Sequence, residues 1–111
     1  MSKNERLYGL TIKDIKKLKS IFKKYPQVNQ VIIYGSRAKG NYRPSSDIDL
    51  TLVGEVEWPD FQKIEIDLDD LLLPYQIDLS IMSHISNPEL LKHIQRVGQP
   101  FYQRTNHSDT S

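Results

Sequence analysis

Residues 31–53 read VIIYGSRAKGNYRPSSDIDLTLV, and this segment decides the fold that we expect. Its first four residues are apolar or aromatic and largely β-branched, which is typical of a short strand buried on both faces. Gly35 then lets the backbone turn sharply, and Ser36 begins a short helix whose first N–H groups face outward. Residues 47–53 return to a strand pattern that begins with two aspartates. The segment therefore predicts a strand, a sharp polar turn and a second strand.

The two aspartates are spaced to bind a divalent cation. Asp47 and Asp49 lie two apart on a predicted strand, so both carboxylates point to one face, with Cα atoms roughly 6.5 Å apart. Carboxylates held this close raise each other's proton affinity, and a divalent cation removes that cost. Mg²⁺ takes one or two carboxylates plus substrate phosphates, and two such ions can hold the attacking and leaving oxygens of an in-line displacement. The outward N–H groups after Ser36 are suited to the phosphates of a nucleotide.

Two further charged residues are assigned to this site. Asp78 stands inside an apolar strand predicted at residues 75–82, where an unpaired charge would be costly. Because neighbouring strands could bring it beside Asp49, we predict that it is a third catalytic and metal-binding carboxylate. The alternative is a strand-end carboxylate paired with a lysine. Arg37 follows the polar turn directly, and we assign it to nucleotide binding together with Gly35.

The rest of the chain alternates helix and strand patterns. Thr11 and Asn87 are predicted helix caps, and Gly98 and Pro100 are expected to end the last helix. Apolar periodicity predicts helices at residues 12–25, 59–72 and 88–97. The order is helix, strand, short helix, strand, helix, strand, helix, which predicts an α/β (α+β) domain with a small mixed sheet flanked by helices. We expect this domain at residues 1–104 and a disordered tail at residues 105–111.

The composition excludes several classes of protein. The 111 residues suit one domain, and a net charge of +1 gives no field that would favour nucleic acid or an anionic membrane. The absence of cysteine excludes disulfides and thiolate metal sites, which fits a reducing cytoplasm. There is no apolar run of the roughly 18–20 residues that a membrane span needs, and no secretory signal at the start. Nucleic-acid and membrane binding are therefore not expected.

Some residues resemble site residues but have simpler explanations. Asp67 and Asp69 repeat the Asp-x-Asp spacing, yet they fall in a helical pattern, where positions two apart diverge by about 200° and cannot share a metal. They are predicted to lie on a solvated acidic face. His84, His93 and His107 show neither metal-ligand spacing nor an evident partner, so each is predicted to be an ordinary surface or core histidine.

The combined pattern resembles a known superfamily. Gly35-Ser36-Arg37-Ala38-Lys39-Gly40, followed by Ser46-Asp47-Ile48-Asp49-Leu50, is similar to the signature of the DNA polymerase β-like nucleotidyltransferases. The short length resembles the minimal nucleotidyltransferase (MNT) branch, often the antitoxin partner of a HEPN-domain protein. This resemblance implies phosphate binding by Ser36, Mg²⁺ binding by Asp47 and Asp49, and the third acid role for Asp78. It also implies transfer of AMP from ATP onto a tyrosine of a HEPN toxin, within a hetero-oligomer.

Three functions therefore remain open on the sequence. The leading hypothesis is adenylylation of a partner protein, because a complete nucleotide and metal motif stands in a chain with little room for an acceptor-binding domain. A second is a non-catalytic antitoxin that neutralises its partner by forming a complex. A third keeps the enzyme class but makes the acceptor a small hydroxyl compound.

Overall fold

The segment 31–53 lies at the centre of a four-stranded sheet. In the computed structural model, which describes residues 6–105, strand β3 spans Val28–Tyr34, helix α2 Gly35–Lys39 and strand β4 Ile48–Gly54. Strands β3 and β4 pair antiparallel. Strand β5 (Ile77–Ile81) joins β4 in parallel, and β6 (Gln99–Gln103) pairs antiparallel with β3. The sheet order is β5-β4-β3-β6, so the predicted mixed sheet is confirmed.

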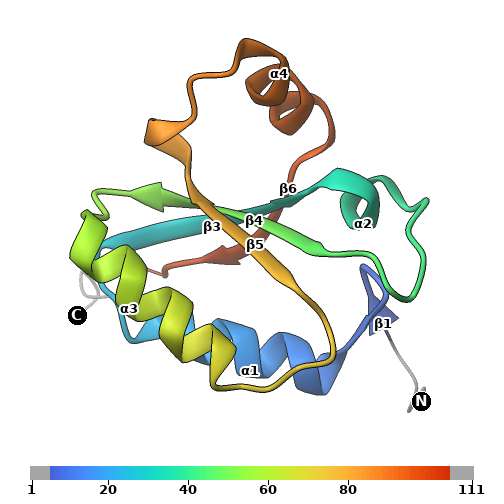
Figure 1. Ribbon diagram of the computed structural model, residues 1–111, viewed down its shortest axis with the longest axis horizontal. Helices are drawn as coiled ribbons and strands as arrows, with labels where there is room; N and C mark the ends of the chain where they lie inside the picture. Colours follow the sequence, from blue (N-terminus) through green and yellow to red (C-terminus); the bar gives the residue numbers. More distant parts are fainter. Residues whose placement is uncertain (1–5, 106–111) are drawn as a thin grey trace.

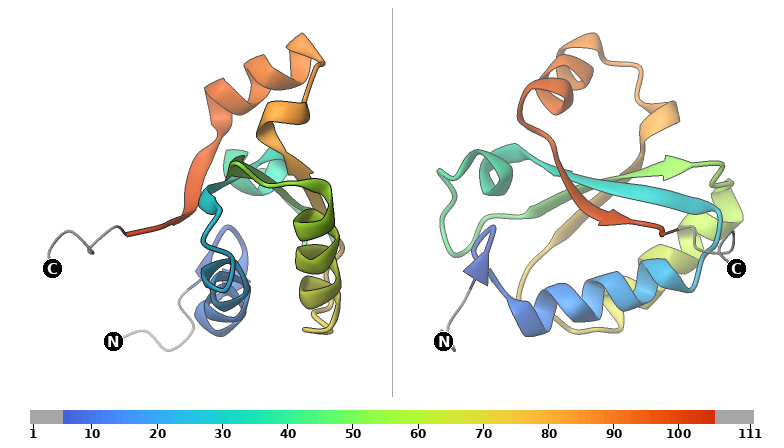
Figure 2. Two further views of the ribbon diagram at one scale, coloured as in Figure 1. Left: turned by 90° about the vertical axis from the view of Figure 1, so that its left-hand side faces the viewer. Right: turned by 180° about the vertical axis from the view of Figure 1, so that it is seen from behind.

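Helices cover the sheet unequally on its two faces. Helices α1 (Ile12–Lys23) and α3 (Trp58–Asp69) contact each other beneath one face, whereas α4 (Pro88–Val97) stands over the other (Figures 1 and 2). Alternation along the strands sends every second side chain to each face. The core lies on the α1 and α3 side and includes Leu18, Phe22, Val31, Ile33, Leu50, Leu52, Phe61 and Ile64. The intervening residues of β3, β4 and β5 are thereby left for the α4 side.

The helix starts follow the predicted caps. The Thr11 hydroxyl accepts the Asp14 N–H at 3.1 Å, and the Asn87 side chain accepts the N–H groups of the two residues after Pro88. Helix α1 ends at Lys23, two residues earlier than predicted. Tyr25 lies in the turn that follows, where its N–H donates to the carbonyl of Phe22, and its side chain still packs against the core as predicted.

Strand β6 was not predicted. Gly98 and Pro100 indicated only the end of a helix, but the chain continues directly into residues 99–103 and pairs with β3. Pro100 lacks an N–H donor and is tolerated because β6 is an edge strand. Phe101 and Tyr102 are consecutive and both buried, so the strand shows no alternation that a sequence pattern could reveal. The short 3₁₀ helix η1 (Met82–His84) and the hairpin of β1 (Arg6–Leu7) and β2 (Leu10–Thr11) were also not predicted.

Two earlier predictions concern the ends of the chain and its membrane propensity. Apart from Thr105, the predicted disordered tail at residues 105–111 lies outside the described residues. Within residues 6–105, every helix is too short or too polar to cross a bilayer.

Candidate active site

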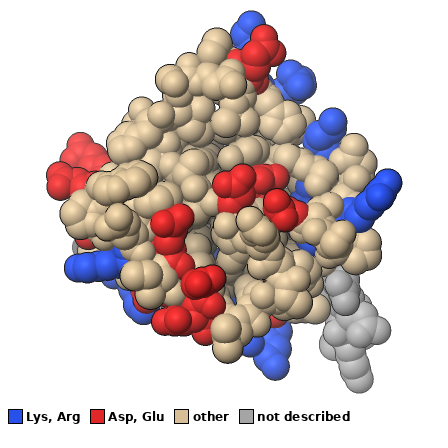
Figure 3. Space-filling model, in the orientation of Figure 1, with Lys and Arg blue, Asp and Glu red and all other residues tan. Residues whose placement is uncertain are grey.

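The strand register brings one residue from each of three neighbouring strands into a single row across the sheet, which we call the carboxylate row. Tyr34 of β3 lies opposite Asp49 of β4, and Asp49 lies opposite Asp78 of the parallel strand β5. The prediction that Asp78 comes to lie beside Asp49 is therefore confirmed. Asp47 lies one residue before β4 and is exposed. Figure 3 shows carboxylates exposed near the middle of this face, apart from a second acidic group over α3.

The carboxylates of the row are electrostatically coupled. Burial, the largest cause, and the negative charges of Asp78 and Asp47 together raise the pKa of Asp49 to about 6. Arg37 opposes this shift only weakly, as the last of the causes. Burial also raises the pKa of the Tyr34 phenol, with additional contributions from Asp49 and Asp78. Negative charge is thus concentrated here at an energetic cost to the folded protein.

The polar turn after β3 lies directly against this row. Gly35 has a φ of 77°, a left-handed conformation that favours glycine. A Cβ atom at this position would overlap the Asp49 carboxylate, so the absence of a side chain at Gly35 lets the backbone and the acid approach each other closely. Ser36 follows as the second residue of α2 and is half-buried. The structure therefore brings Gly35, Ser36 and the aspartates together.

Arg37 has a different role from the one predicted. Its side chain is only 2% exposed, and its guanidinium donates hydrogen bonds to the backbone carbonyls of Tyr8, Pro44 and Ser46 at 2.9–3.2 Å. The guanidinium also lies over the rings of Tyr42 and Tyr75, at 5.3 and 5.0 Å from their centroids. Its donors are therefore committed to the protein, and the assignment of Arg37 to nucleotide contact is corrected. Arg37 instead fixes the loop that delivers Asp47 and Asp49.

The donor set fits a magnesium ion that shares its ligands with a substrate. Within the described part of the chain, no three His, Asp or Glu side chains form a complete metal cage. Mg²⁺ does not require one, because it binds through one or two carboxylates plus phosphate oxygens and water. The elevated pKa of Asp49 shows that the row favours positive charge, either a proton or a cation. The residues present therefore fit Mg²⁺ in company with a nucleotide.

The Asp-x-Asp pair of α3 is confirmed as a helical feature. Asp69 is exposed, whereas Asp67 accepts a hydrogen bond from the Tyr25 hydroxyl and a salt bridge from Lys24 at 3.1 Å. These bonds join the end of α1 to α3, so Asp67 is a packing residue rather than a member of a purely solvated face. Hydrogen bonding from Tyr25 and Lys24 lowers its pKa, the opposite of the effect at Asp49.

An open groove of about 890 Å³ lies elsewhere, between α3 and β5. Its wall includes Ile77 and Leu79, the neighbours of Asp78 along β5. Because side chains alternate along a strand, Asp78 points to the opposite face of the sheet. The groove is therefore separate from the carboxylate row.

Comparison with known families identifies the family of the chain. The family described as "Polymerase beta, Nucleotidyltransferase" matches residues 16–107, which include the polar turn and all three aspartates. The chain belongs to this family. It is a nucleotidyltransferase of the polymerase β type. The turn at Gly35, Asp47 and Asp49 lie within the segment that led to the resemblance, whereas Asp78 comes from β5.

Relatives of this nucleotidyltransferase agree with that placement. A Methanocaldococcus jannaschii protein named "Putative protein adenylyltransferase MJ0128" is 40% identical over 88 residues, covering 76% of this chain and 88% of the relative. A crystal structure of a toxin–antitoxin with AMP-PNP matches 86% of this chain and 77% of its own, with a TM-score of 0.66 and 18% identity. A structure of a tri-AMPylated Shewanella oneidensis HEPN toxin in complex with an MNT antitoxin aligns with 87% of this chain and 75% of the solved chain, with a TM-score of 0.60 and 16% identity. These two structures share the fold.

Two residues of this candidate site were not found from the sequence. Tyr34 was read only as a strand residue, although its place directly before Gly35 was a usable signal. His93 was expected to have no partner, and that prediction is wrong, because its Nε2 accepts the Gly35 N–H at 3.2 Å. No local pattern could reveal a contact between residues 58 positions apart. His84 is exposed and stacks near Trp58, as an ordinary surface histidine, and His107 lies outside the described residues.

Proposed function

We propose that this nucleotidyltransferase transfers AMP from ATP to a tyrosine hydroxyl of a HEPN-type toxin, with which it assembles, and so acts as an antitoxin. The observation that carries the proposal is the pairing of Asp49 with Asp78 beside the turn at Gly35. This arrangement places acidic oxygen ligands next to backbone N–H groups and a serine hydroxyl. Few reactions other than transfer of a phosphate-linked group use both sets of groups together.

The reaction assigns a role to each residue. The acceptor oxygen attacks the α-phosphorus of ATP, the bond from that phosphorus to the bridging oxygen breaks, and pyrophosphate leaves. Ser36 and the backbone N–H groups that follow it bind the phosphates, and Asp78, exposed at the row, takes the hydroxyl proton. Asp47, Asp49 and Asp78 would hold two Mg²⁺ ions together with the phosphates, and these ions would supply charge neutralisation.

The relatives support a protein as the acceptor. The relative with 40% identity carries the name of a protein adenylyltransferase. Among structures that share the fold, one toxin–antitoxin contains AMP-PNP, and another pairs an MNT antitoxin with a tri-AMPylated HEPN toxin. We carry these properties to the present chain as a proposal, since its own carboxylate row and turn have the geometry that such chemistry needs.

The test uses ATP labelled at two different positions. The protein is incubated with Mg²⁺, the product of the adjacent gene, and ATP labelled at either the α- or the γ-phosphate. We expect label from α-labelled ATP alone to enter the partner. Asp49→Asn and Asp78→Asn should lower the rate about 100-fold or more. Asp69→Asn, an exposed aspartate of α3 with the same local spacing, is the matched control and should transfer at the wild-type rate.

Other outcomes would contradict this proposal. Transfer of the γ-label would indicate a kinase, and undiminished transfer by Asp49→Asn would remove that residue from the chemistry. If an Asp47→Asn/Asp49→Asn double variant protected cells from the partner as well as wild type, complex formation alone would account for the antitoxin effect. Labelling of a small hydroxyl compound with an unlabelled partner would reassign the acceptor.

A further inference from the structure

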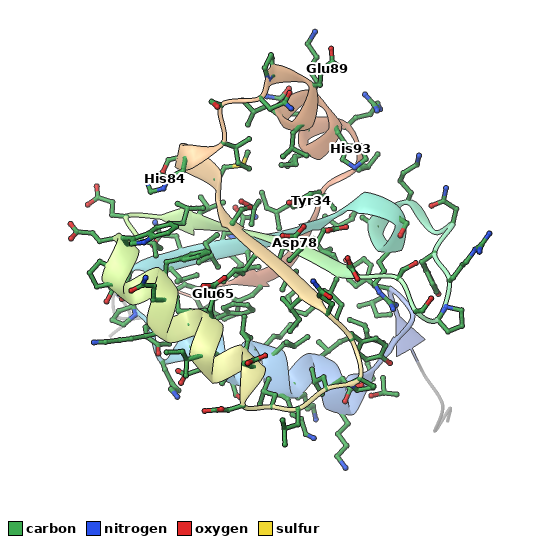
Figure 4. All side chains as sticks on the ribbon, in the orientation of Figure 1. Tyr34, Glu65, Asp78, His84, Glu89 and His93 are labelled. Atoms are coloured by element: carbon green, nitrogen blue, oxygen red, sulfur yellow. The ribbon has the colours of Figure 1, made fainter. Side chains whose placement is uncertain are left out.

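Helix α4 makes a specific polar contact with the nucleotide turn. The Gly35 N–H donates to Nε2 of His93 at 3.2 Å. Figure 4 shows His93 projecting from α4 toward the sheet, on the side where Tyr34 and Asp78 lie. The imidazole also meets the Tyr34 ring edge-on, with ring centroids 6.2 Å apart and an interplanar angle of 79°. An accepting Nε2 requires the neutral imidazole with its proton on Nδ1.

The contact acts at a sensitive point of the site. Gly35 holds its left-handed φ while its backbone lies against the Asp49 carboxylate. Any rotation of the peptide before Gly35 would move both the Ser36 hydroxyl and the backbone that faces Asp49. Since a hydrogen bond fixes the direction of an N–H group, His93 restricts this rotation.

The helix that carries His93 is itself anchored to the sheet. Ile94, the next residue, is buried, and α4 contacts both α2 and β3. At the end of the helix, a Cβ atom on Gly98 would approach within 2.8 Å of the Ile32 side chain on β3, so the backbone at Gly98 packs closely against that side chain. The helix backbone that carries His93 is therefore held in place against the sheet.

We propose that His93 is a positioning residue of this enzyme, which holds the Gly35 peptide so that the turn is preorganised for the nucleotide phosphates. The inference rests on the proposed nucleotide site and deepens it. Preorganised donors contribute to binding because they need no reorganisation when the ligand arrives. His93 thus acts through Gly35 and does not itself touch the reacting atoms.

The test separates the hydrogen bond from ring packing. His93→Phe keeps a ring against Tyr34 but has no acceptor, whereas His93→Gln retains an acceptor close to the position of Nε2. His84→Phe, on the exposed surface, is the matched control. We expect His93→Phe to raise KM for ATP and the Kd for AMP-PNP about tenfold, with a smaller change in kcat, and His93→Gln to remain within about threefold of wild type. Hydrogen exchange of the Gly35 amide should accelerate in His93→Phe only.

Each result decides the matter. A wild-type Kd in His93→Phe, or equal defects in His93→Phe and His93→Gln, would overturn the positioning role while leaving the proposed function intact. Failure of the wild-type protein to bind AMP-PNP would overturn the proposed function and the role of His93 within it. Unchanged exchange of the Gly35 amide in His93→Phe would show that the hydrogen bond does not restrain the turn.

Discussion

The substitution Asp49→Asn should stabilise the free protein while abolishing its activity. Asp49 is partly buried and faces Asp78 and Asp47, so its ionised form is disfavoured in the folded state, where its pKa rises to about 6. Asparagine has nearly the same shape and carries no charge. The substitution therefore removes the repulsion and leaves the packing against Gly35 in place.

The size of the effect follows from the pKa. A rise from 3.8 to about 6 is about two units, or roughly 3 kcal/mol at 1.36 kcal/mol per unit. Solvent reaches this half-buried carboxyl, and screening reduces the expected gain to about 1–2 kcal/mol. Below pH 3.8 the carboxyl is protonated in both states and contributes nothing. As pH rises from about 3.8 to about 6, the unfolded chain ionises first, so wild-type stability falls; above pH 6 the full cost remains.

Urea unfolding at pH 3, 5, 6 and 8, without Mg²⁺ or nucleotide, measures this dependence. Asp49→Asn should match wild type at the lowest pH and exceed it by about 1–2 kcal/mol at pH 8, a rise of about 4–10 °C in Tm. Asp67→Asn is the matched control, for which we expect a change in stability of the opposite sign. Its pKa is lowered in the folded state, so the substitution should destabilise the protein above the ordinary Asp pKa and lose its effect in acid. A destabilised Asp49→Asn protein at pH 8, or a gain independent of pH, would refute the electrostatic reasoning.

Three further substitutions test the frame of the site. Gly35→Ala should cost about 1–3 kcal/mol of stability and abolish AMP-PNP binding in calorimetry, because φ is 77° and Cβ meets the Asp49 carboxylate. Arg37→Lys should cost about 2–3 kcal/mol in urea unfolding, because a compact ammonium cannot span the separated carbonyls of Tyr8, Pro44 and Ser46 as the planar guanidinium does; wild-type stability would contradict this role of Arg37. Tyr25→Phe should cost about 1 kcal/mol by losing its bond to Asp67, with transfer activity unchanged; a loss of activity would connect this contact to the site.

Much of the site could be predicted from local chemistry. The turn at Gly35 and the two aspartates after it are close in sequence, and each needs a particular residue type for a reason that holds in any fold. The predicted caps at Thr11 and Asn87 are confirmed for the same reason, because a cap satisfies N–H groups within three residues of itself. The helical pattern around Asp69 likewise sufficed to separate it from the metal-type pair.

Contacts between segments that are distant in the sequence could be determined only from the tertiary structure. The residue type of Arg37 shows a cation, but only packing shows that its donors are used by carbonyls of the hairpin and the loop. Strand β6 exists because β3 offers it an open edge, and its five residues carry no periodicity of their own. His93 has no partner in its own helix, and its contact with Gly35 depends on how α4 folds back over the sheet.

The sequence by itself therefore determined the chemistry of the segment 31–53: a glycine turn, a serine and two carboxylates spaced for one face of a strand. It could suggest that Asp78 belongs with them, since a charge inside an apolar strand needs a reason. Only the parallel register of β4 and β5 decided that Asp78 lies opposite Asp49, and the partial burial of Asp49 near the charges of Asp78 and Asp47 raised its pKa to about 6. Spacing is a property of the chain, whereas register and burial arise only when separate strands pack together.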